Sequence, residues 1–252
     1  MDPRLIVALD TADRRQALDL VETLQGVVRT FKIGLEFFST HGPSGVREVA
    51  SLGAQIFLDL KFHDIPNTVA GAVYSVCTLP GVTMVTVHAS GGRQMLQAAL
   101  GAARASRRSD FVSEVPGARR PALLGVSVLT SLDAQDLQET GVPCSPAEQV
   151  AHLARLTRES GLDGLVCSPL EVQSLRQALG NDFLLVAPGI RPAAATTGDQ
   201  KRTATPAQAI RAGASYLVVG RPVTADPSPR EAARRLLAAL PRQETRRGHS
   251  FS

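Results

Sequence analysis

The sequence predicts a single α/β barrel, because eight short apolar runs alternate with longer helical segments along its 252 residues. The runs are rich in Val, Ile and Leu and almost continuously apolar, which is typical of parallel strands buried on both faces. They lie at Leu5–Asp10, Phe31–Glu36, Gln55–Leu60, Met84–His88, Ala122–Val128, Gly164–Ser168, Phe183–Ala187 and Tyr216–Gly220. No change of composition marks a domain boundary between them. We therefore expect one (β/α)8 TIM barrel with a parallel eight-stranded core.

The segments between these runs show the apolar spacing of amphipathic helices. Arg14–Leu24 and Pro146–Ser160 are the clearest, with apolar residues at every third or fourth position. The alternative fold is an open, doubly wound sheet, whose first strand is typically followed by G-x-G-x-x-G. Here Leu9-Asp10-Thr11-Ala12-Asp13 stands in that place, so the barrel is the preferred prediction.

We expect the barrel to form one domain over residues 1–241. Residues 242–252 are polar and basic and are predicted to form a disordered tail. The stretch Ser106–Pro121 is also irregular in pattern, and it is predicted to be a loop or a helix end before the fifth strand.

The composition is that of an ordinary globular protein, with 44% hydrophobic and 20% charged residues. The net charge of +4 comes from scattered basic residues, and only 4% of residues are aromatic, so we expect no nucleic-acid partner. The three cysteines, Cys77, Cys144 and Cys167, form no C-x-x-C pair, which is typical of a reducing cytosol. Because no apolar run approaches the length of a signal peptide or a membrane span, we expect a cytoplasmic protein.

Lysine is rare in this chain. Only three of the 27 basic residues are lysines, Lys32, Lys61 and Lys201, so nearly every surface cation is an arginine. A lysine ammonium is a compact charge that gives up a proton, whereas arginine stays charged. Lys61 also lies between two carboxylates, Asp59 and Asp64, which makes this segment the strongest candidate for catalysis.

Asp59 and Lys61 are predicted to point into the mouth of the barrel. Side chains alternate between the two faces of a strand, so both residues share a face with Phe57, and the intervening Ile and Leu residues are expected to pack on the helices. An ion pair inside an apolar run costs desolvation and returns little stability. A functional role is therefore favoured over a surface salt bridge, in a fold whose functional groups collect where strands end.

Two glycine–arginine pairs follow the last two strands, where barrels of this class commonly bind phosphate. They end the segments Val186-Ala-Pro-Gly189-Ile-Arg191 and Val218-Val-Gly220-Arg221. Glycine lets backbone N–H groups approach an anion, and arginine adds a bidentate contact. Gly198-Asp-Gln200-Lys201-Arg202, in the long connection after the seventh strand, is predicted to be a mobile polar lid.

Several motifs together closely resemble the orotidine 5′-phosphate decarboxylase family in its bacterial form. The most specific is Asp59-Leu-Lys61-Phe-His-Asp64-Ile-Pro-Asn-Thr68. The others, in chain order, are Phe31-Lys32-Ile-Gly34, Leu129-Thr-Ser131, Ala187-Pro-Gly-Ile-Arg191, Asp199-Gln-Lys-Arg202 and Val219-Gly-Arg221. The resemblance extends from Leu5 to Leu240, and Ser106–Pro121 is its least familiar part.

The resemblance implies an enzyme that decarboxylates orotidine 5′-phosphate to UMP in pyrimidine biosynthesis, without a metal or an organic cofactor. It implies an alternating array of charges beneath the pyrimidine, formed by Lys32, Asp59, Lys61 and Asp64. Asp64 of the partner subunit would complete each site of a homodimer, so that active sites are shared. By the same resemblance, Asp10 and Lys32 contact the ribose, together with Thr68 of the partner subunit. Ser127 and Thr130 lie along the base. The implied phosphate contacts are Arg191, Gln200, Gly220 and Arg221.

Two alternatives stay open. Sugar-phosphate enzymes of the same superfamily, such as hexulose-phosphate synthase, share Asp-x-Lys-x-x-Asp but use Mg²⁺, and Glu36 supplies a carboxylate near Lys32. The Asp-Ile-Pro-Asn-Thr continuation and the Asp-Gln-Lys-Arg segment favour the pyrimidine enzyme, and an assay with and without EDTA separates the two. The other alternative is an inactive phosphate-binding protein. Retention of all four charged residues argues against it, because an idle buried array is costly.

Overall fold

The computed structural model describes residues 2–106, 120–191 and 203–241. Within these ranges eight parallel strands close into a barrel in chain order. They are β1 Leu5–Ala8, β2 Thr30–Ile33, β3 Gln55–Phe62, β4 Val82–His88, β5 Ala122–Val126, β6 Gly164–Val166, β7 Leu184–Ala187 and β8 Tyr216–Val219. The predicted barrel is confirmed, and the open sheet is wrong because β1 pairs with β8. The predicted tail 242–252, the predicted lid 198–202 and most of Ser106–Pro121 lie outside the described residues.

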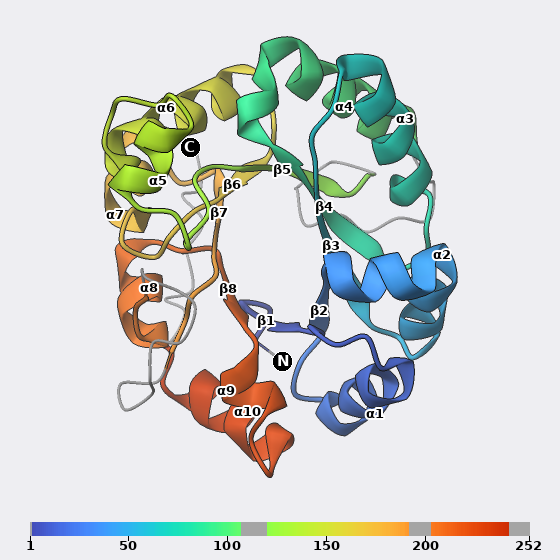
Figure 1. Cartoon of the computed structure of the whole chain (residues 1–252). Helices are drawn as coiled ribbons and strands as arrows, with labels where there is room; N and C mark the ends of the chain where they lie inside the picture. The colour runs from blue at the N-terminus through green and yellow to red at the C-terminus, as the bar shows by residue number, and fades with distance from the viewer. Residues whose placement is uncertain (1, 107–119, 192–202, 242–252) are drawn as a thin grey trace, which may run out of the picture.

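Helices surround the barrel as an outer ring that follows the chain (Figure 1). They are α1 Arg14–Leu24, α2 Leu35–Ser51, α3 Pro66–Cys77, α4 Gly92–Ala105, α5 Ala134–Glu139, α6 Pro146–Glu159, α7 Val172–Leu179, α8 Pro206–Ala212, α9 Arg221–Thr224 and α10 Pro229–Ala238, with a 3₁₀ turn at Ala89–Gly91. The predicted helix Arg14–Leu24 has the same bounds as α1. The predicted helix Pro146–Ser160 ends one residue later than α6. None of the helices in the described ranges is long and apolar enough to cross a membrane.

The second strand is shorter than predicted, because a helix begins within the apolar run. β2 ends at Ile33, Gly34 caps α2, and Leu35 and Glu36 form the first turn of that helix. Leu35 is 56% exposed. Its apolar side chain extended the apolar run in the sequence, although it does not enter the core. The predicted strand over Phe31–Glu36 is therefore wrong for its last three positions.

Polar side chains at the helix starts fix where several helices begin. The Asp13 carboxylate accepts a hydrogen bond from the Gln16 amide at the start of α1. Ser145 and Thr205 begin α6 and α8 with capping boxes, in which the cap residue and the third helical residue bond to each other's amides. Such caps satisfy amides that have no acceptor within the helix, so each loop enters its helix at a defined residue.

Alternation along the strands divides the core into two layers. One face packs inside the barrel as a buried cluster of Ile6, Ala8, Phe57, Met84, Ala122, Leu124, Val186, Tyr216 and Val218. The other face packs against the helices in a much larger cluster that includes Ile56, Leu58 and Leu60. Phe57 is therefore inside the barrel and its neighbours are outside, as the alternation in the third run predicted.

The end of the barrel opposite the mouth is held by a buried ion pair. Arg120, before β5, and Asp163, before β6, make two hydrogen bonds of 2.6 and 2.9 Å. Their side chains are only 9% and 8% exposed. The Asp163 carboxylate also accepts a hydrogen bond from the Leu123 amide at 2.7 Å, so it connects β5 to the segment that leads into β6.

Asp163→Ala is expected to lower the free energy of unfolding by about 3–5 kcal/mol, because it leaves the Arg120 guanidinium buried without its partner. The matched control is Glu159→Ala, which removes the exposed pair between Glu159 and Arg93 and is expected to cost less than about 1 kcal/mol. Urea denaturation followed by circular dichroism measures both changes. A loss at Asp163 no larger than the loss at Glu159 would show that the buried pair does not stabilise the fold.

Candidate active site

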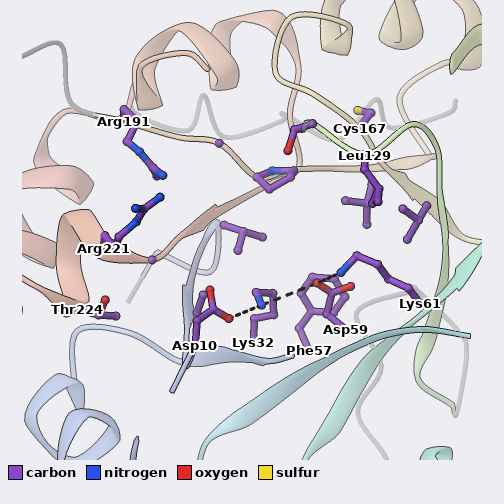
Figure 2. A pocket seen from close by; sticks show the side chains of 18 of the residues that line it. Asp10, Lys32, Phe57, Asp59, Lys61, Leu129, Cys167, Arg191, Arg221 and Thr224 are labelled. Atoms are coloured by element: carbon purple, nitrogen blue, oxygen red, sulfur yellow. Dashed lines mark hydrogen bonds and ion pairs between the residues drawn. The ribbon is translucent and has the colours of Figure 1, made fainter. Parts of the chain in front are cut away.

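A cavity of about 400 Å³ opens at the mouth of the barrel, where the strands end. A volume in this range suits a small-molecule ligand. Phe57 and Val218 of the inner core form part of its apolar lining. Charged groups reach it from Asp10, Lys32, Asp59, Lys61, Arg191 and Arg221, whose side chains surround one space in Figure 2.

Four of these side chains form a continuous ionic chain along one side of the cavity. Lys32 Nζ lies 2.7 Å from Asp10 Oδ1 and 3.8 Å from Asp59 Oδ2. Lys61 Nζ lies 2.8 Å from the same Asp59 Oδ2. The expected proximity of Asp59 and Lys61 is present, and Lys32 and Asp10 extend the pair into alternating charges (Figure 2).

Asp59 is the most buried member of this ionic chain. Its side chain is 10% exposed, whereas the side chain of Asp10 is 57% exposed. A buried carboxylate is costly unless it is paired and hydrogen-bonded, and Asp59 is both. Its Oδ2 faces the two ammonium groups, and its Oδ1 accepts a hydrogen bond from the Thr86 hydroxyl at 3.0 Å.

The backbone of Lys61 has an unusual conformation. Its φ of 51° makes it the only non-glycine residue with positive φ in the part of the chain that the structure describes, and such strain costs roughly 1–3 kcal/mol. The register of β3 against β4 shifts between Leu58 and Phe62, and the Lys61 amide donates to Thr86 Oγ1 at 2.9 Å. Alternation along β3 predicted the face that Lys61 takes, but it did not predict this irregularity.

Two residues that shape the ionic chain were not predicted as site residues. Thr86 lies two positions after Met84 of the inner core and is completely buried. The only signal for it was a hydroxyl at an inward position of an apolar run. Gly34 is the second, because a Cβ at this position would lie 3.0 Å from Lys32 Nζ and would crowd the ammonium group.

Two arginines lie across the cavity from Lys61 (Figure 2). Arg191 follows β7, and Arg221 begins the short helix α9 after β8. Gly189 and Gly220 also line the cavity, and Gly189 has a φ of 77°, which glycine adopts without steric strain. The two glycine–arginine pairs, 30 residues apart in the chain, meet at one side of the cavity, an arrangement suited to an anion.

Some of the predicted site residues lie elsewhere. Asp64 and Thr68, at the start of α3, are exposed and do not line this cavity. Ser127 is 4% exposed and does not line it either, and its hydroxyl donates to a backbone carbonyl of β6 at 2.9 Å. Thr130 does line the cavity, and Gln200 is outside the described residues.

The carboxylates of the cavity are engaged by lysines rather than grouped together. Asp10 and Asp59 each contact at least one ammonium group. Glu36, the carboxylate considered for Mg²⁺, is exposed in the first turn of α2 and does not line the cavity. Within residues 2–106, 120–191 and 203–241, no group of three or more His, Cys, Asp or Glu side chains is placed to hold a metal ion.

A closed α/β barrel with an ionic chain and two arginines at its mouth defines a barrel enzyme for a small anionic ligand. Comparison with known proteins then assigns its family. Residues 3–236 match the group described as the orotidine 5′-phosphate decarboxylase / HUMPS family. Because the match covers nearly the whole chain, the protein belongs to this family.

Individual relatives place the chain more closely within the family. An orotidine 5′-phosphate decarboxylase of Moorella thermoacetica is 50% identical over 240 residues, which cover 94% of this chain and 92% of the relative. One from Actinobacillus succinogenes is 48% identical over 240 residues, with 95% and 99% covered. The crystal structure of the decarboxylase from Lactobacillus acidophilus has a TM-score of 0.82 at 37% identity, over 96% of this chain and 100% of that chain. The chain is therefore a carboxy-lyase of this family.

His88, at the end of β4, is half-buried beside the ionic chain. Its ring centroid lies 5.5 Å from that of His63. Burial lowers the pKa of His88 below its usual value of 6.5, the charges of His63 and Lys61 lower it further, and Asp59 opposes them. The folded protein therefore favours the neutral imidazole.

Acidification is expected to destabilise the wild type more than His88→Gln. As the pH falls through 6.5, the unfolded chain takes up a proton at this histidine before the folded chain does, so stability decreases. Thermal unfolding between about pH 8 and about pH 5 measures the effect. His152→Gln, on the exposed face of α6, serves as the control and should follow the wild type. An equal loss of stability in wild type and His88→Gln would contradict the lowered pKa.

Proposed function

We propose that this enzyme converts orotidine 5′-phosphate to UMP in pyrimidine biosynthesis, with Lys61 stabilising and protonating the carbanion at C6. The observation that carries the proposal is the buried Asp59, held between the ammonium groups of Lys32 and Lys61 in a cavity with arginines on its other side. The family and the relatives described above support the activity itself. No metal or organic cofactor takes part in the proposed reaction.

The proposed role of Lys61 follows from the charge that develops during the reaction. Loss of CO₂ from C6 leaves a carbanion in the plane of the ring, which the π system of the ring does not delocalise. A cation fixed beside C6 stabilises this charge as it forms and then donates a proton to it. Lys61 suits both steps, because its ammonium lines the cavity and is held by Asp59 at 2.8 Å.

Asp59 is proposed to hold the Lys61 ammonium in place and to face the departing carboxylate. Its Oδ2 contacts two ammonium groups, so it cannot turn away without losing both. Loss of CO₂ removes the negative charge of the substrate carboxylate from beside Asp59 and leaves the new negative charge beside Lys61. The fixed charges thus favour the product side of the step without having to reorganise.

The 5′-phosphate is proposed to contact Arg191, Gly220 and Arg221, together with Gln200. The two arginines lie across the cavity from Lys61 (Figure 2), so a nucleotide that spans the cavity presents its phosphate to them and its base to the ionic chain. Contacts to a phosphate remote from C6 supply binding energy that orders the reacting groups.

The remaining substrate contacts are proposed by position. Asp10 and Lys32, at the outer end of the ionic chain, would bind the ribose hydroxyls, because Asp10 is the most exposed of the four charged groups. Ser127 and Thr130, which follow β5, would lie along the base. Ser127 would act from behind the cavity lining, whereas Thr130 is part of that lining.

We further propose a homodimer with shared active sites. Asp64 and Thr68 are exposed and lie outside their own cavity, which supports a role in the site of another subunit. Ile65 beside them is 66% exposed, and Tyr74 of α3 is 48% exposed. Exposed apolar side chains of this size, when they gather on one element, are typical of protein interfaces. In a two-fold dimer such sharing is symmetric, so both sites are composite.

Lys61→Ala is expected to lower kcat by about 10³-fold or more, because it removes the cation beside C6 and the proton donor, while UMP still binds. Lys61→Arg should not restore activity, because a guanidinium does not give up a proton at accessible pH. A spectrophotometric decarboxylation assay and calorimetric titration with UMP measure the two effects. Activity of either variant within about tenfold of the wild type would remove Lys61 from the mechanism.

Arg221→Ala is expected to reduce kcat/KM for orotidine 5′-phosphate by about 10- to 150-fold, which corresponds to the loss of about 1.5–3 kcal/mol from a charge-assisted contact. Orotidine without the phosphate lacks the dianion, so its kcat/KM should not change. Steady-state kinetics with both substrates make the comparison. Equal losses for the two substrates would mean that Arg221 does not bind the phosphate.

Mixing inactive Lys61→Ala and Asp64→Ala dimers is expected to restore activity. Subunit exchange gives a heterodimer in which one composite site carries both defects and the other is wholly native. Activity per heterodimer should approach half of the wild-type value. Lys61→Ala dimers carried through the same exchange with themselves are the control. Verified exchange without recovered activity would show that Asp64 does not act in the site of the partner subunit.

A further inference from the structure

We propose that Thr86 is a positioning residue that holds Asp59 and Lys61 in their catalytic arrangement, an inference that rests on the function proposed above. Thr86 lies within β4, is completely buried and does not line the cavity. Its hydroxyl is engaged by Asp59 and by the Lys61 amide, so we expect it not to contact a bound substrate. Any effect of Thr86 on the reaction passes through the residues that its side chain contacts.

The hydroxyl of Thr86 joins the two residues. Thr86 Oγ1 donates a hydrogen bond to Asp59 Oδ1 at 3.0 Å and accepts one from the Lys61 amide at 2.9 Å. The other carboxylate oxygen, Asp59 Oδ2, is left to face the ammonium groups of Lys61 and Lys32. A single side chain thus sets both the orientation of the carboxylate and the position of the lysine backbone.

The pairing of β3 with β4 explains why a side chain is needed here. Leu58 and Phe62 are each paired with a residue of β4, and the residues between them, Asp59 to Lys61, lie opposite Thr86 alone. Such an irregularity interrupts the ladder of backbone hydrogen bonds. The Lys61 amide takes the Thr86 side chain as its acceptor instead, and Lys61 holds a φ of 51°.

Removal of the hydroxyl would release both contacts at once. The Lys61 amide would lose its acceptor, and the carboxylate of Asp59 would lose the donor that fixes its rotation. Misplacement of a reacting group by about 1 Å costs on the order of 10²-fold in rate. Because Thr86 lies on β4 and the arginines proposed to bind the phosphate follow β7 and β8, we expect the loss to fall on kcat rather than on KM.

Three variants test this role. Thr86→Val keeps the shape of the side chain and removes the hydroxyl, whereas Thr86→Ser keeps the hydroxyl and removes the methyl group. The matched control is Thr83→Val, because Thr83 is a buried threonine of the same strand whose hydroxyl donates to the Ile56 carbonyl at 3.4 Å. We expect Thr86→Val to lower kcat about 10- to 100-fold with KM changed less than about threefold. Thr86→Ser and Thr83→Val should keep kcat within about threefold of the wild type.

Hydrogen exchange reports on the same contact without using activity. The Lys61 amide should exchange faster in Thr86→Val than in the wild type or in Thr86→Ser, because only Thr86→Val removes its acceptor. If Thr86→Val does not fold, Thr86→Ala and Thr86→Ser form the comparison, since both lack the methyl group and they differ in the hydroxyl.

Three results would overturn the inference: a kcat for the variant without the hydroxyl within about threefold of the wild type, equal losses in Thr86→Ser and that variant, or unchanged exchange of the Lys61 amide. Failure of the proposed function is read separately, from Lys61→Ala. An active Lys61→Ala enzyme removes the mechanism whatever the Thr86 variants show. An inactive Lys61→Ala enzyme beside an unaffected Thr86→Val enzyme removes the role of Thr86 alone.

Discussion

The buried carboxylate of Asp59 is the group on which the arrangement of the whole site depends. Its burial is tolerated because two ammonium groups face one oxygen and a hydroxyl donates to the other. Lys32, Lys61 and Thr86 come from three neighbouring strands, β2, β3 and β4. One carboxylate therefore ties these strands together at the mouth of the barrel, and loss of any one partner leaves a buried charge incompletely compensated.

The barrel makes this arrangement possible by placing the partners on rigid, adjacent strands. β3 pairs with β2 on one side and with β4 on the other, and Lys32 of β2 lies beside Phe57, two residues before Asp59. At the opposite end of the barrel, the ion pair of Arg120 and Asp163 connects the segments that lead into β5 and β6. Between these two ends, apolar side chains such as Ile6, Phe57 and Met84 pack inside the barrel. The charges are thus held in place before a substrate arrives, as the proposed electrostatic catalysis requires.

Several of these features follow from local patterns in the chain. The apolar runs located the eight strands, because parallel strands buried on both faces are almost continuously apolar. Alternation in the third run predicted that Phe57 is inside and that Asp59 and Lys61 point to the mouth. Locating strands from apolar runs failed at Leu35, an apolar residue that belongs to the first turn of α2 and is largely exposed. Apolarity alone does not distinguish a strand residue from a helix residue on the surface.

Contacts between separate segments do not follow from local patterns in the chain. The face that a side chain takes is a local property of its strand, so Asp59 and Lys61 were assigned to the mouth from the amino-acid order alone. The irregular backbone of Lys61 and the two hydrogen bonds of Thr86 depend on how β3 aligns against β4, and neither strand encodes that alignment by itself. The chain order therefore determined which charged groups reach the mouth of the barrel. The packed fold decided which of them touch, because a distance between two side chains is set by two segments together and not by either one.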